Sequence, residues 1–373
     1  MKYLYKLFIT DKEPKFFIKI IMSTIILLLS YHAIMWQLFT KELLDTKCPK
    51  YVGDLARLSF QPNSIDIRKC NYYTIKNKHS EIYDYNDSKY DILTLGDSFS
   101  NGVVQGENQY YQDYISTIYK TSVINITNNR LKLNYVDTLL SLLENKILDK
   151  MEIKVVIIET IERYAIQRFA TSLKWKSELS LSDLNKQIKK ENSFKHKPND
   201  VTFINNGNYK VLLNSVLYSF KNKAFKDSKV YSSKLNKDLF TVKASKNLLH
   251  YYEDTQNIAY SNLHSISSLN NNMNHLATIL KKHNIKLIFM PIVDKYNLYS
   301  PYIKNDKFQK SQFFELLEPL KKDYYLINTK EILSKLLPKE KDIFYADDTH
   351  WTHKASEEVV KSIPFNKILL NEL

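Results

Sequence analysis

The chain has 373 residues, of which 44% are hydrophobic and 25% are charged, so it can bury one large core. A formal net charge of +14 would suit a polyanionic partner, but lysine and asparagine are abundant throughout, and no dense basic cluster or nucleic-acid-binding motif stands out. We therefore expect one main domain and no nucleic acid as a partner.

The N-terminal part contains an uncharged apolar segment. Residues 20–40, IIMSTIILLLSYHAIMWQLFT, are long enough to cross a bilayer as one helix. Lysines are frequent in residues 1–19, whereas the lysines just after the segment are balanced by acidic residues. The positive-inside rule then places residues 1–19 in the cytoplasm. A cleaved signal peptide is the alternative, but no small-residue cleavage site follows. We expect a single-pass anchor in the inner (cytoplasmic) membrane, with the rest of the chain periplasmic or otherwise extracytoplasmic.

Residues 41–89 mix polar and aromatic residues without clear periodicity, and we predict a stalk that packs loosely on the domain. The only two cysteines, Cys48 and Cys70, lie in this segment. In an oxidising compartment they could form a disulfide, and two buried thiols are the alternative. Their spacing does not resemble a zinc site.

From residue 90 onward, short apolar runs alternate with helical patterns. The runs predict buried strands at residues 91–95, 122–126, 154–160, 285–292 and 324–327. Apolar residues at helical spacing predict helices at 110–120, 135–145 and 263–282. This alternation predicts an α/β domain over residues 90–373, with a parallel sheet covered on both faces. Residues 165–260 break the rhythm and are interpreted as an insertion, part helix and part loop, on the rim of the sheet.

The first predicted strand of this domain ends in a loop that contains a serine, Leu95-Gly96-Asp97-Ser98. Ligands of parallel α/β sheets bind beyond the carboxyl ends of the strands, which is where Ser98 falls. Three of the five glycines, Gly96, Gly102 and Gly106, occur in this loop, which indicates tight backbone geometry. The alternative is an ordinary strand-to-helix turn in which Asp97 or Ser98 caps a helix.

A second group of polar residues follows the last predicted strand. Asp347 and His350 lie three residues apart in the segment YADDTHWTH. A serine hydroxyl becomes nucleophilic when a base removes its proton, and the base needs a carboxylate to fix its tautomer. One turn could supply both groups for Ser98. The alternative is a surface loop in which His350 caps a helix predicted at residues 352–362.

The pairing of LGDSFS with a distant DDTHW resembles the SGNH/GDSL superfamily over roughly residues 90–365. Within it, the chain is most similar to SGNH-like O-acetyltransferases related to the alginate O-acetylation proteins. The similarity lies in three segments, IIETIER at 157–163, PIVDKYNLY at 291–299 and DTHW at 348–351. The resemblance implies a flavodoxin-like three-layer sandwich, with Ser98 as nucleophile and His350 as base. Either Asp347 or Asp348 would orient His350, and Asp347 is preferred.

The sequence departs from the family in the blocks that build the oxyanion hole. Ordinary esterases have Gly-x-Asn-Asp where this chain has Glu162-Arg163. The backbone N–H of Ser98, an amide of Asn128 or Asn129, and Arg163 are the donors expected to take over. For contact with a glycan, the resemblance points to Arg163, Lys295 and Tyr299.

The resemblance implies a membrane-anchored enzyme that acetylates hydroxyls of an exported polysaccharide or other cell-envelope glycan through an acyl-Ser98 intermediate. Activated acetyl groups are cytoplasmic, so a membrane-bound O-acyltransferase is the expected acetyl donor, and neither a metal nor a cofactor is implied. One alternative is an esterase or deacetylase on the same polymers, which would include a relative acting on D-alanyl esters. Another is a non-catalytic subunit that binds glycan or scaffolds an export complex.

Overall fold

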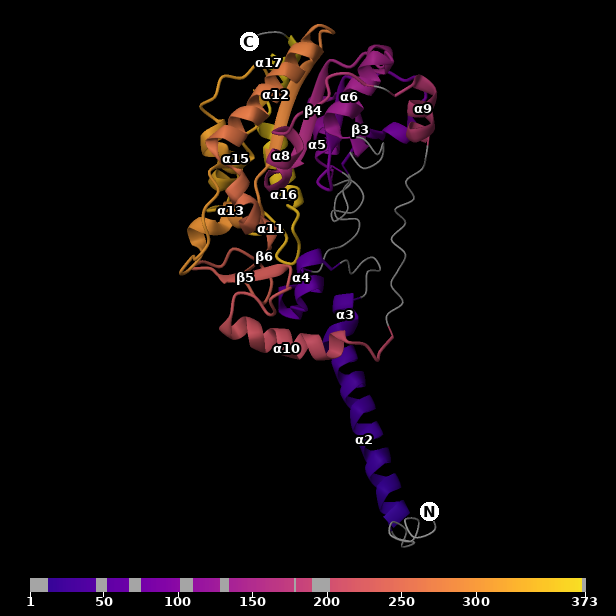
Figure 1. Ribbon diagram of the computed structural model, residues 1–373, viewed down its shortest axis with the longest axis vertical. Coiled ribbons are helices and arrows are strands. Elements are labelled where there is room, and N and C mark those ends of the chain that lie inside the picture. The colour runs from indigo at the N-terminus through magenta and orange to yellow at the C-terminus, as the bar shows by residue number, and fades with distance from the viewer. Residues whose placement is uncertain are drawn as a thin grey trace.

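The computed structural model describes residues 13–44, 52–66, 75–100, 110–127, 134–177, 179–189 and 202–370 (Figure 1). These residues form an α/β body from which one long N-terminal helix projects. Cys48 and Cys70 lie outside the described residues, so their pairing remains a prediction.

A six-stranded parallel sheet forms the centre of the body, and its strand order is β1-β3-β2-β4-β7-β8. The strands are β1 (Ser80–Glu81), β2 (Ile92–Gly96), β3 (Val123–Thr127), β4 (Val155–Ile161), β7 (Lys286–Ile292) and β8 (Tyr325–Leu326). All five predicted strands are confirmed within a residue or two. The edge strand β1 was not predicted because two residues are too short for any periodicity to show.

The sheet is covered on both faces, as its sequence pattern predicted. All seven residues of β4 are buried, and successive side chains of a strand point to opposite faces. The helices predicted at 110–120, 135–145, 263–282 and 352–362 are confirmed as α5 (Tyr111–Tyr119), α6 (Tyr135–Glu144), α12 (Leu263–Lys281) and α16 (His353–Ser362). The remaining helices around the sheet are α7 (Ile147–Lys150), α8 (Glu162–Phe169), α13 (Lys295–Tyr299), α14 (Phe313–Leu317), α15 (Thr329–Leu336) and α17 (Phe365–Leu370).

Asparagine side chains start two of the predicted helices. Asn134 accepts a hydrogen bond from the N–H of Asp137 at the start of α6, and Asn262 accepts one from Ser265 at the start of α12. Each contact satisfies a backbone donor that has no partner within its helix.

The N-terminal helix α2 (Glu13–Met35) continues through a π-helical turn, η1 (Trp36–Thr40), into α3 (Lys41–Leu44). Together, α2 and η1 contain the apolar segment predicted at 20–40, and residues 15–30 are all exposed. Lys15–Leu44 is long and apolar enough to cross a membrane, and a signal sequence would pass the same test. Figure 1 shows α2 extending well away from the body.

The prediction of a loosely packed stalk is wrong for residues 52–66. This segment forms α4 (Asp54–Ser59) and the short turn η2 (Pro62–Ser64), and Leu55 and Ala56 are fully buried. The N–H of Ala56 donates to the backbone oxygen of Asp347 at 3.0 Å. A six-residue helix gives too few repeats for its buried face to show in the sequence.

The segment predicted as an insertion has more regular structure than expected. Its helices are α9 (Leu181–Lys189), α10 (Gly207–Phe220) and α11 (Glu253–Gln256), and β5 (Val230–Lys234) pairs antiparallel with β6 (Asn247–Tyr251). The two-stranded sheet was not predicted. In Figure 1, α10 crosses the end of α2 that joins the body, and α4 lies between α10 and the main sheet.

Candidate active site

Ser98 and His350 meet at the carboxyl end of the central strands. Ser98 lies two residues beyond the end of β2, and His350 precedes α16 by three residues. His350 Nε2 lies 2.6 Å from Ser98 Oγ, which is hydrogen-bonding distance. Ser98 is half-buried and His350 is buried, so the predicted convergence of these two residues is confirmed.

The carboxylate that holds His350 belongs to Asp348, which corrects the preference for Asp347. Asp348 Oδ1 lies 2.7 Å from His350 Nδ1 and also accepts the backbone N–H of His350 at 3.0 Å. Asp347 is directed elsewhere, and its Oδ2 accepts the N–H of Gly53 at 2.8 Å. The reason is local. An Asp side chain readily bonds the backbone two residues ahead, and this turn places its carboxylate beside the ring.

The surroundings of His350 favour a charged imidazole next to Asp348. Burial alone would lower the pKa of His350, but the hydrogen bond and charge of Asp348 raise it above the usual value of 6.5. The ring centroid lies 4.7 Å from that of Phe99, and Phe99 meets Trp351 edge to face at 5.4 Å. Trp351 is fully buried. These contacts hold the imidazole on the Ser98 side of its loop.

The loop that carries His350 is also held by Asp54, which comes from the N-terminal part of the chain. Asp54, at the start of α4, accepts two hydrogen bonds from Thr349, one from the backbone N–H at 2.9 Å and one from the hydroxyl at 2.8 Å. The N–H of Asp54 donates to Asp348 Oδ2 at 3.1 Å. Burial and the charge of Asp348 raise the pKa of Asp54. The start of α4 therefore fixes the loop that carries His350.

Position 53 must be glycine, because any side chain there would clash with the loop that carries His350. A Cβ at position 53 would lie 2.2 Å from the backbone oxygen of Asp347 and 2.7 Å from Cβ of Asp348. The φ angle of Gly53 is −63°, so the requirement is steric and not conformational.

The loop that carries Ser98 is fixed by a buried carboxyl group. Glu159 Oε2 accepts from the N–H of Asp97 at 3.0 Å and from the hydroxyl of Ser100 at 2.7 Å. A Cβ on Gly96 would lie 1.9 Å from Ser100 Oγ and 2.3 Å from that oxygen. The glycine expected from the tight turn is therefore required at position 96, whereas Gly102 and Gly106 lie outside the described residues.

An ion pair stabilises the same loop from the side of α8. Arg168 donates to Asp97 Oδ2 at 2.6 Å, and Asp97 Oδ1 accepts the N–H of Phe99 at 3.2 Å. Burial opposes ionisation of Asp97, but Arg168 lowers its pKa below the usual value. Burial and the charge of Asp97 raise the pKa of Glu159 well above its usual range. One carboxyl group is thus kept ionised and its neighbour is driven toward the neutral form.

Lys295 and Tyr299 do not face a substrate, which corrects the expectation of glycan contact. Lys295 is 1% exposed, and its Nζ donates to the backbone oxygens of Tyr345, Ala346 and Asp348 at 2.7, 3.1 and 2.9 Å. Burial lowers the pKa of Lys295 to about 8. Tyr299 is fully buried, and its hydroxyl accepts the N–H of Phe344 at 3.2 Å. Both residues position the loop that carries His350.

Arg163 is also held away from the position of an oxyanion donor. Its Nη1 contacts Asp294 at 2.7 Å and Asp254 at 3.1 Å, and its side chain is 10% exposed. Burial would lower the pKa of Arg163, but the two carboxylates raise it. A guanidinium held by two carboxylates is a structural group here. Asn128 and Asn129 lie outside the described residues, so their predicted role is untested.

Three side chains of the site have the spacing of a metal cluster. Ligand atoms of Asp54, Asp348 and His350 lie within 4.8 Å of one another. Their oxygens, however, already accept hydrogen bonds from Thr349, His350 and the backbone of Asp54. The arrangement fits a hydrogen-bonded Ser-His-Asp group better than it fits a cation.

The sequence reasoning missed the residues that support the site. Gly53 and Asp54 were assigned to a stalk, and Glu159 and Arg168 were not considered as partners of the Ser98 loop. A signal was present for Gly53, because the chain has only five glycines and this one stands alone in its segment. Glu159 also stood out in the sequence, as a carboxyl group within a predicted strand and directly after the apolar run at residues 155–158.

Comparison of the chain with known proteins found no matching family model, no matching curated protein and no matching solved structure.

Proposed function

We propose that this chain is a membrane-anchored serine acyltransferase of the SGNH/GDSL type that acetylates hydroxyls of an extracytoplasmic glycan. The observation that carries the proposal is the continuous hydrogen-bond relay from Ser98 Oγ through His350 to Asp348, with distances of 2.6 and 2.7 Å. A base oriented by a carboxylate and in contact with a hydroxyl is the arrangement that activates a serine.

The strand order supports the family resemblance. Leaving out the edge strand β1, the order β3-β2-β4-β7-β8 corresponds to 2-1-3-4-5 along the chain. This is the doubly wound flavodoxin-like order, in which ligands bind at the switch point between the first and third strands. Ser98 lies at the end of β2, the first strand in that count.

The reaction would proceed in two half-reactions. Ser98 Oγ attacks the acetyl carbonyl carbon of the donor while His350 Nε2 takes the serine proton and passes it to the leaving group. This leaves an acetyl ester on Ser98. A sugar hydroxyl then attacks the ester, His350 takes the hydroxyl proton and returns it to Ser98 Oγ, and the acetylated sugar departs.

The backbone N–H of Ser98 is a suitable donor for the oxyanion that forms in each half-reaction. No hydrogen bond from this N–H occurs among the residues that the structure describes. A preorganised donor of this kind stabilises a transition state by about 3 kcal/mol.

The test is acyl transfer by the purified full-length chain. With p-nitrophenyl acetate as donor and an oligosaccharide acceptor, the wild type should yield acetylated oligosaccharide by mass spectrometry, and Ser98→Ala should yield none while keeping its melting temperature. Release of acetate with no acetylated sugar would favour the esterase alternative. Absence of both products, together with no fluorophosphonate labelling of Ser98, would favour a non-catalytic subunit.

A further inference from the structure

Helix α10 carries an apolar stripe on its exposed face. Val211, Asn214 and Tyr218 lie on its buried face. Large apolar side chains occupy the opposite face at spacings of three and four residues, and they are Tyr209, Leu212, Leu213, Val216 and Phe220, with exposed fractions of 42, 47, 54, 58 and 84%. Flanking residues Phe203 and Phe225 are 43% and 48% exposed. A contiguous exposed apolar stripe of this kind marks a binding surface.

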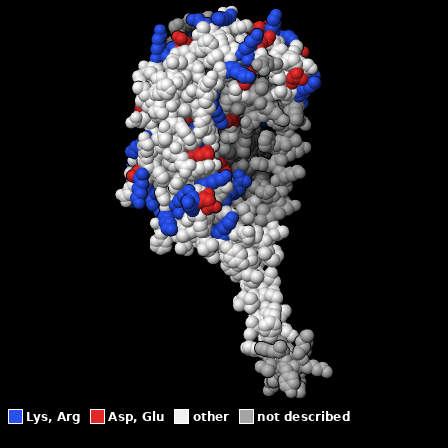
Figure 2. All heavy atoms as spheres, in the orientation of Figure 1, with Lys and Arg blue, Asp and Glu red and all other residues white. Residues whose placement is uncertain are grey.

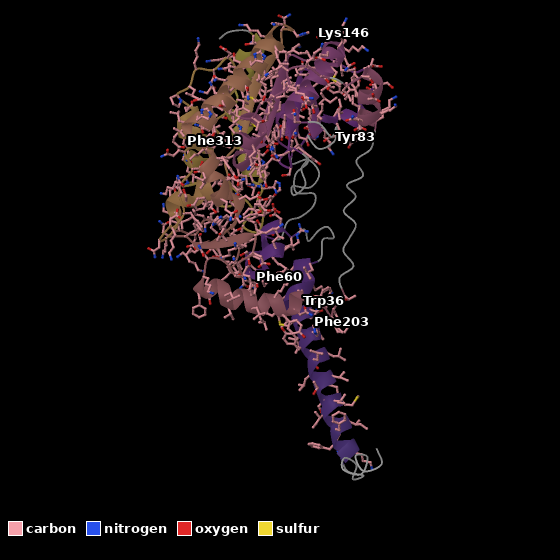
Figure 3. The ribbon with its side chains drawn as sticks, in the orientation of Figure 1. Trp36, Phe60, Tyr83, Lys146, Phe203 and Phe313 are labelled. Carbon is pink, nitrogen blue, oxygen red and sulfur yellow. The ribbon has the colours of Figure 1, made fainter. Side chains whose placement is uncertain are left out.

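This stripe lies where α10 crosses the N-terminal helix. Asn208 Nδ2 lies 2.7 Å from His32 Nδ1, and the hydroxyl of Tyr209 lies 3.0 Å from His32 Nε2. The hydroxyl of Tyr31 donates to the backbone oxygen of Asn208 at 2.8 Å. Figure 3 shows Trp36, Phe60 and Phe203 around the same junction. Contact with α10 therefore begins at residue 31 of α2.

The exposed part of α2 is long enough to cross most, but not all, of a bilayer before α2 reaches α10. Residues 15–30 are exposed, and a helix rises 1.5 Å per residue, which gives about 24 Å. The hydrocarbon core of a bilayer is about 30 Å thick. If α2 spans the membrane, its outer boundary falls at the level of α10, whose apolar stripe then continues the apolar surface of α2.

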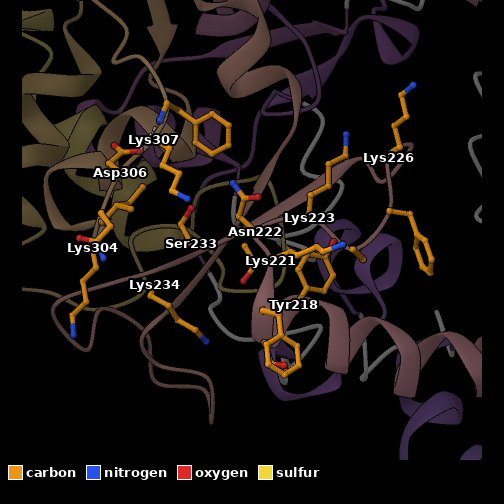
Figure 4. A pocket seen from close by; sticks show the side chains of 18 residues that line it. Tyr218, Lys221, Asn222, Lys223, Lys226, Ser233, Lys234, Lys304, Asp306 and Lys307 are labelled. Carbon is orange, nitrogen blue, oxygen red and sulfur yellow. Dashed lines mark hydrogen bonds between the residues drawn. The ribbon is translucent and has the colours of Figure 1, made fainter.

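Lysines follow the stripe directly. Lys221, Lys223 and Lys226 come directly after α10, in the same short segment as the exposed Phe220 and Phe225. They line a pocket of about 780 Å³ (Figure 4), together with Lys234, Lys304 and Lys307. The acidic residue in that lining, Asp306, already accepts the hydroxyl of Tyr296 at 2.9 Å. On the face shown in Figure 2, Lys and Arg occupy the part of the body next to the apolar stem as well as the end far from it.

We propose that α10 is an interfacial helix, with its apolar stripe in the outer leaflet and the lysines that follow it on anionic lipid headgroups. The inference rests on the proposed anchoring by α2. The occupant is lipid because the stripe is continuous with the lipid-facing surface of α2 and is flanked by positive charge, the pattern of helices that lie in the membrane plane. Two membrane contacts, one across the bilayer and one along its surface, would fix the orientation of the body above the bilayer.

Photo-crosslinking to lipid tests the proposal on the full-length chain. The protein is reconstituted, without other proteins, into phosphatidylcholine vesicles that contain phosphatidylglycerol and a phospholipid with a diazirine in its acyl chain. Peptide mapping should find crosslinks in residues 17–30 and in 207–220, and none at Tyr83, an exposed aromatic residue far from α10 (Figure 3).

Each pattern of crosslinks decides between the two proposals. Crosslinks in α2 without crosslinks in α10 would overturn the interfacial helix and leave the anchor standing. Crosslinks in neither would overturn both the anchor and the interfacial helix. In native membranes, crosslinking of α10 to a protein and not to lipid would also overturn the inference.

A substitution series separates the two parts of the surface. The triple variant Leu213→Ser, Val216→Ser and Phe220→Ser changes only exposed side chains and should lower α10 crosslinking severalfold, with α2 crosslinking and Ser98 labelling unchanged. The matched control is Leu181→Ser, an exposed leucine of α9. Replacing Lys221, Lys223 and Lys226 with Glu should remove the gain in crosslinking that phosphatidylglycerol gives over pure phosphatidylcholine. Equal crosslinking in the serine variant and the wild type would contradict the proposal.

Discussion

Asp348 reaches across its own turn to His350, so that one oxygen of its carboxylate contacts both the ring Nδ1 and the backbone N–H of the histidine, at 2.7 and 3.0 Å. The neighbouring Asp347 instead accepts the N–H of Gly53. Two adjacent aspartates therefore have separate tasks, since one orients the base and the other attaches the loop to α4.

Asparagine substitutions should separate these tasks. Asp348→Asn removes the charge that stabilises the imidazolium and should lower the rate of Ser98 acylation by roughly 10³-fold to 10⁴-fold. Asp347→Asn keeps an oxygen that can accept from Gly53, so most of the activity should remain. The measurement is the second-order rate constant for fluorophosphonate labelling of Ser98. Equal losses in the two variants would contradict the assignment.

The reactivity of Ser98 should increase with pH. His350 must be neutral to accept the serine proton, and Asp348 raises its pKa above 6.5. The labelling rate should therefore rise as pH passes through a midpoint above 6.5 and then level off. In Asp348→Asn the midpoint should move to lower pH, because the group that favours the charged ring is gone. A midpoint that is the same in both proteins would show that another group controls the profile.

Gly53→Ala should damage the site from a position in the N-terminal segment. The added methyl group would lie 2.2 Å from the backbone oxygen of Asp347, so α4 or the His350 loop must move. Overpacking of this kind costs about 1 to 3 kcal/mol of stability. We expect a lower melting temperature and slower Ser98 labelling. Leu58→Ala, on the exposed side of α4, is the control and should change neither quantity. A normal labelling rate in Gly53→Ala would show that α4 does not hold the His350 loop in place.

His79 should make the stability of the fold depend on pH in the alkaline range. Burial would lower its pKa, but hydrogen bonds to Asp113 and Glu81 raise it to about 9, compared with 6.5 for an ordinary histidine. A raised pKa in the folded state means that this stabilisation is complete below pH 6.5 and is lost as pH rises through 9. Its size is on the order of 3 kcal/mol.

The corresponding measurement compares the wild type with His79→Gln in thermal unfolding at pH 6 and pH 10. The difference in melting temperature should be large at pH 6 and small at pH 10. A difference that does not change with pH would mean that His79 contributes through packing and not through its charge.

The central strands of the main sheet could be predicted from sequence because they are buried on both faces. Every residue of β2 and β4 is buried, which produces continuous apolar runs that few other structures produce. Ser98 and His350 could be found because chemistry at the end of a parallel strand needs specific residue types there. The choice between Asp347 and Asp348 could not be made, since it depends on which way two adjacent side chains point.

The contacts that support the His350 loop could not be predicted from sequence for a related reason. Lys295 was expected to contact a glycan because its segment resembles one of the family, yet Lys295 is buried and three backbone oxygens replace its hydration. Gly53 and Asp347 are separated by 294 residues, and no local pattern reports a contact over that distance. Tertiary structure, and not local preference, decides where such side chains go.

The bonds from Gly53, Asp54 and Ala56 to the His350 loop bear on how a soluble form of the protein can be prepared. Cutting the chain near residue 90, where the sequence pattern of the sheet begins, would keep all three triad residues. It would also remove the three backbone donors that hold Asp347 and Asp348 in place. A truncated chain that is meant to keep this site intact must therefore begin before Val52, close to the helix that it is designed to lose.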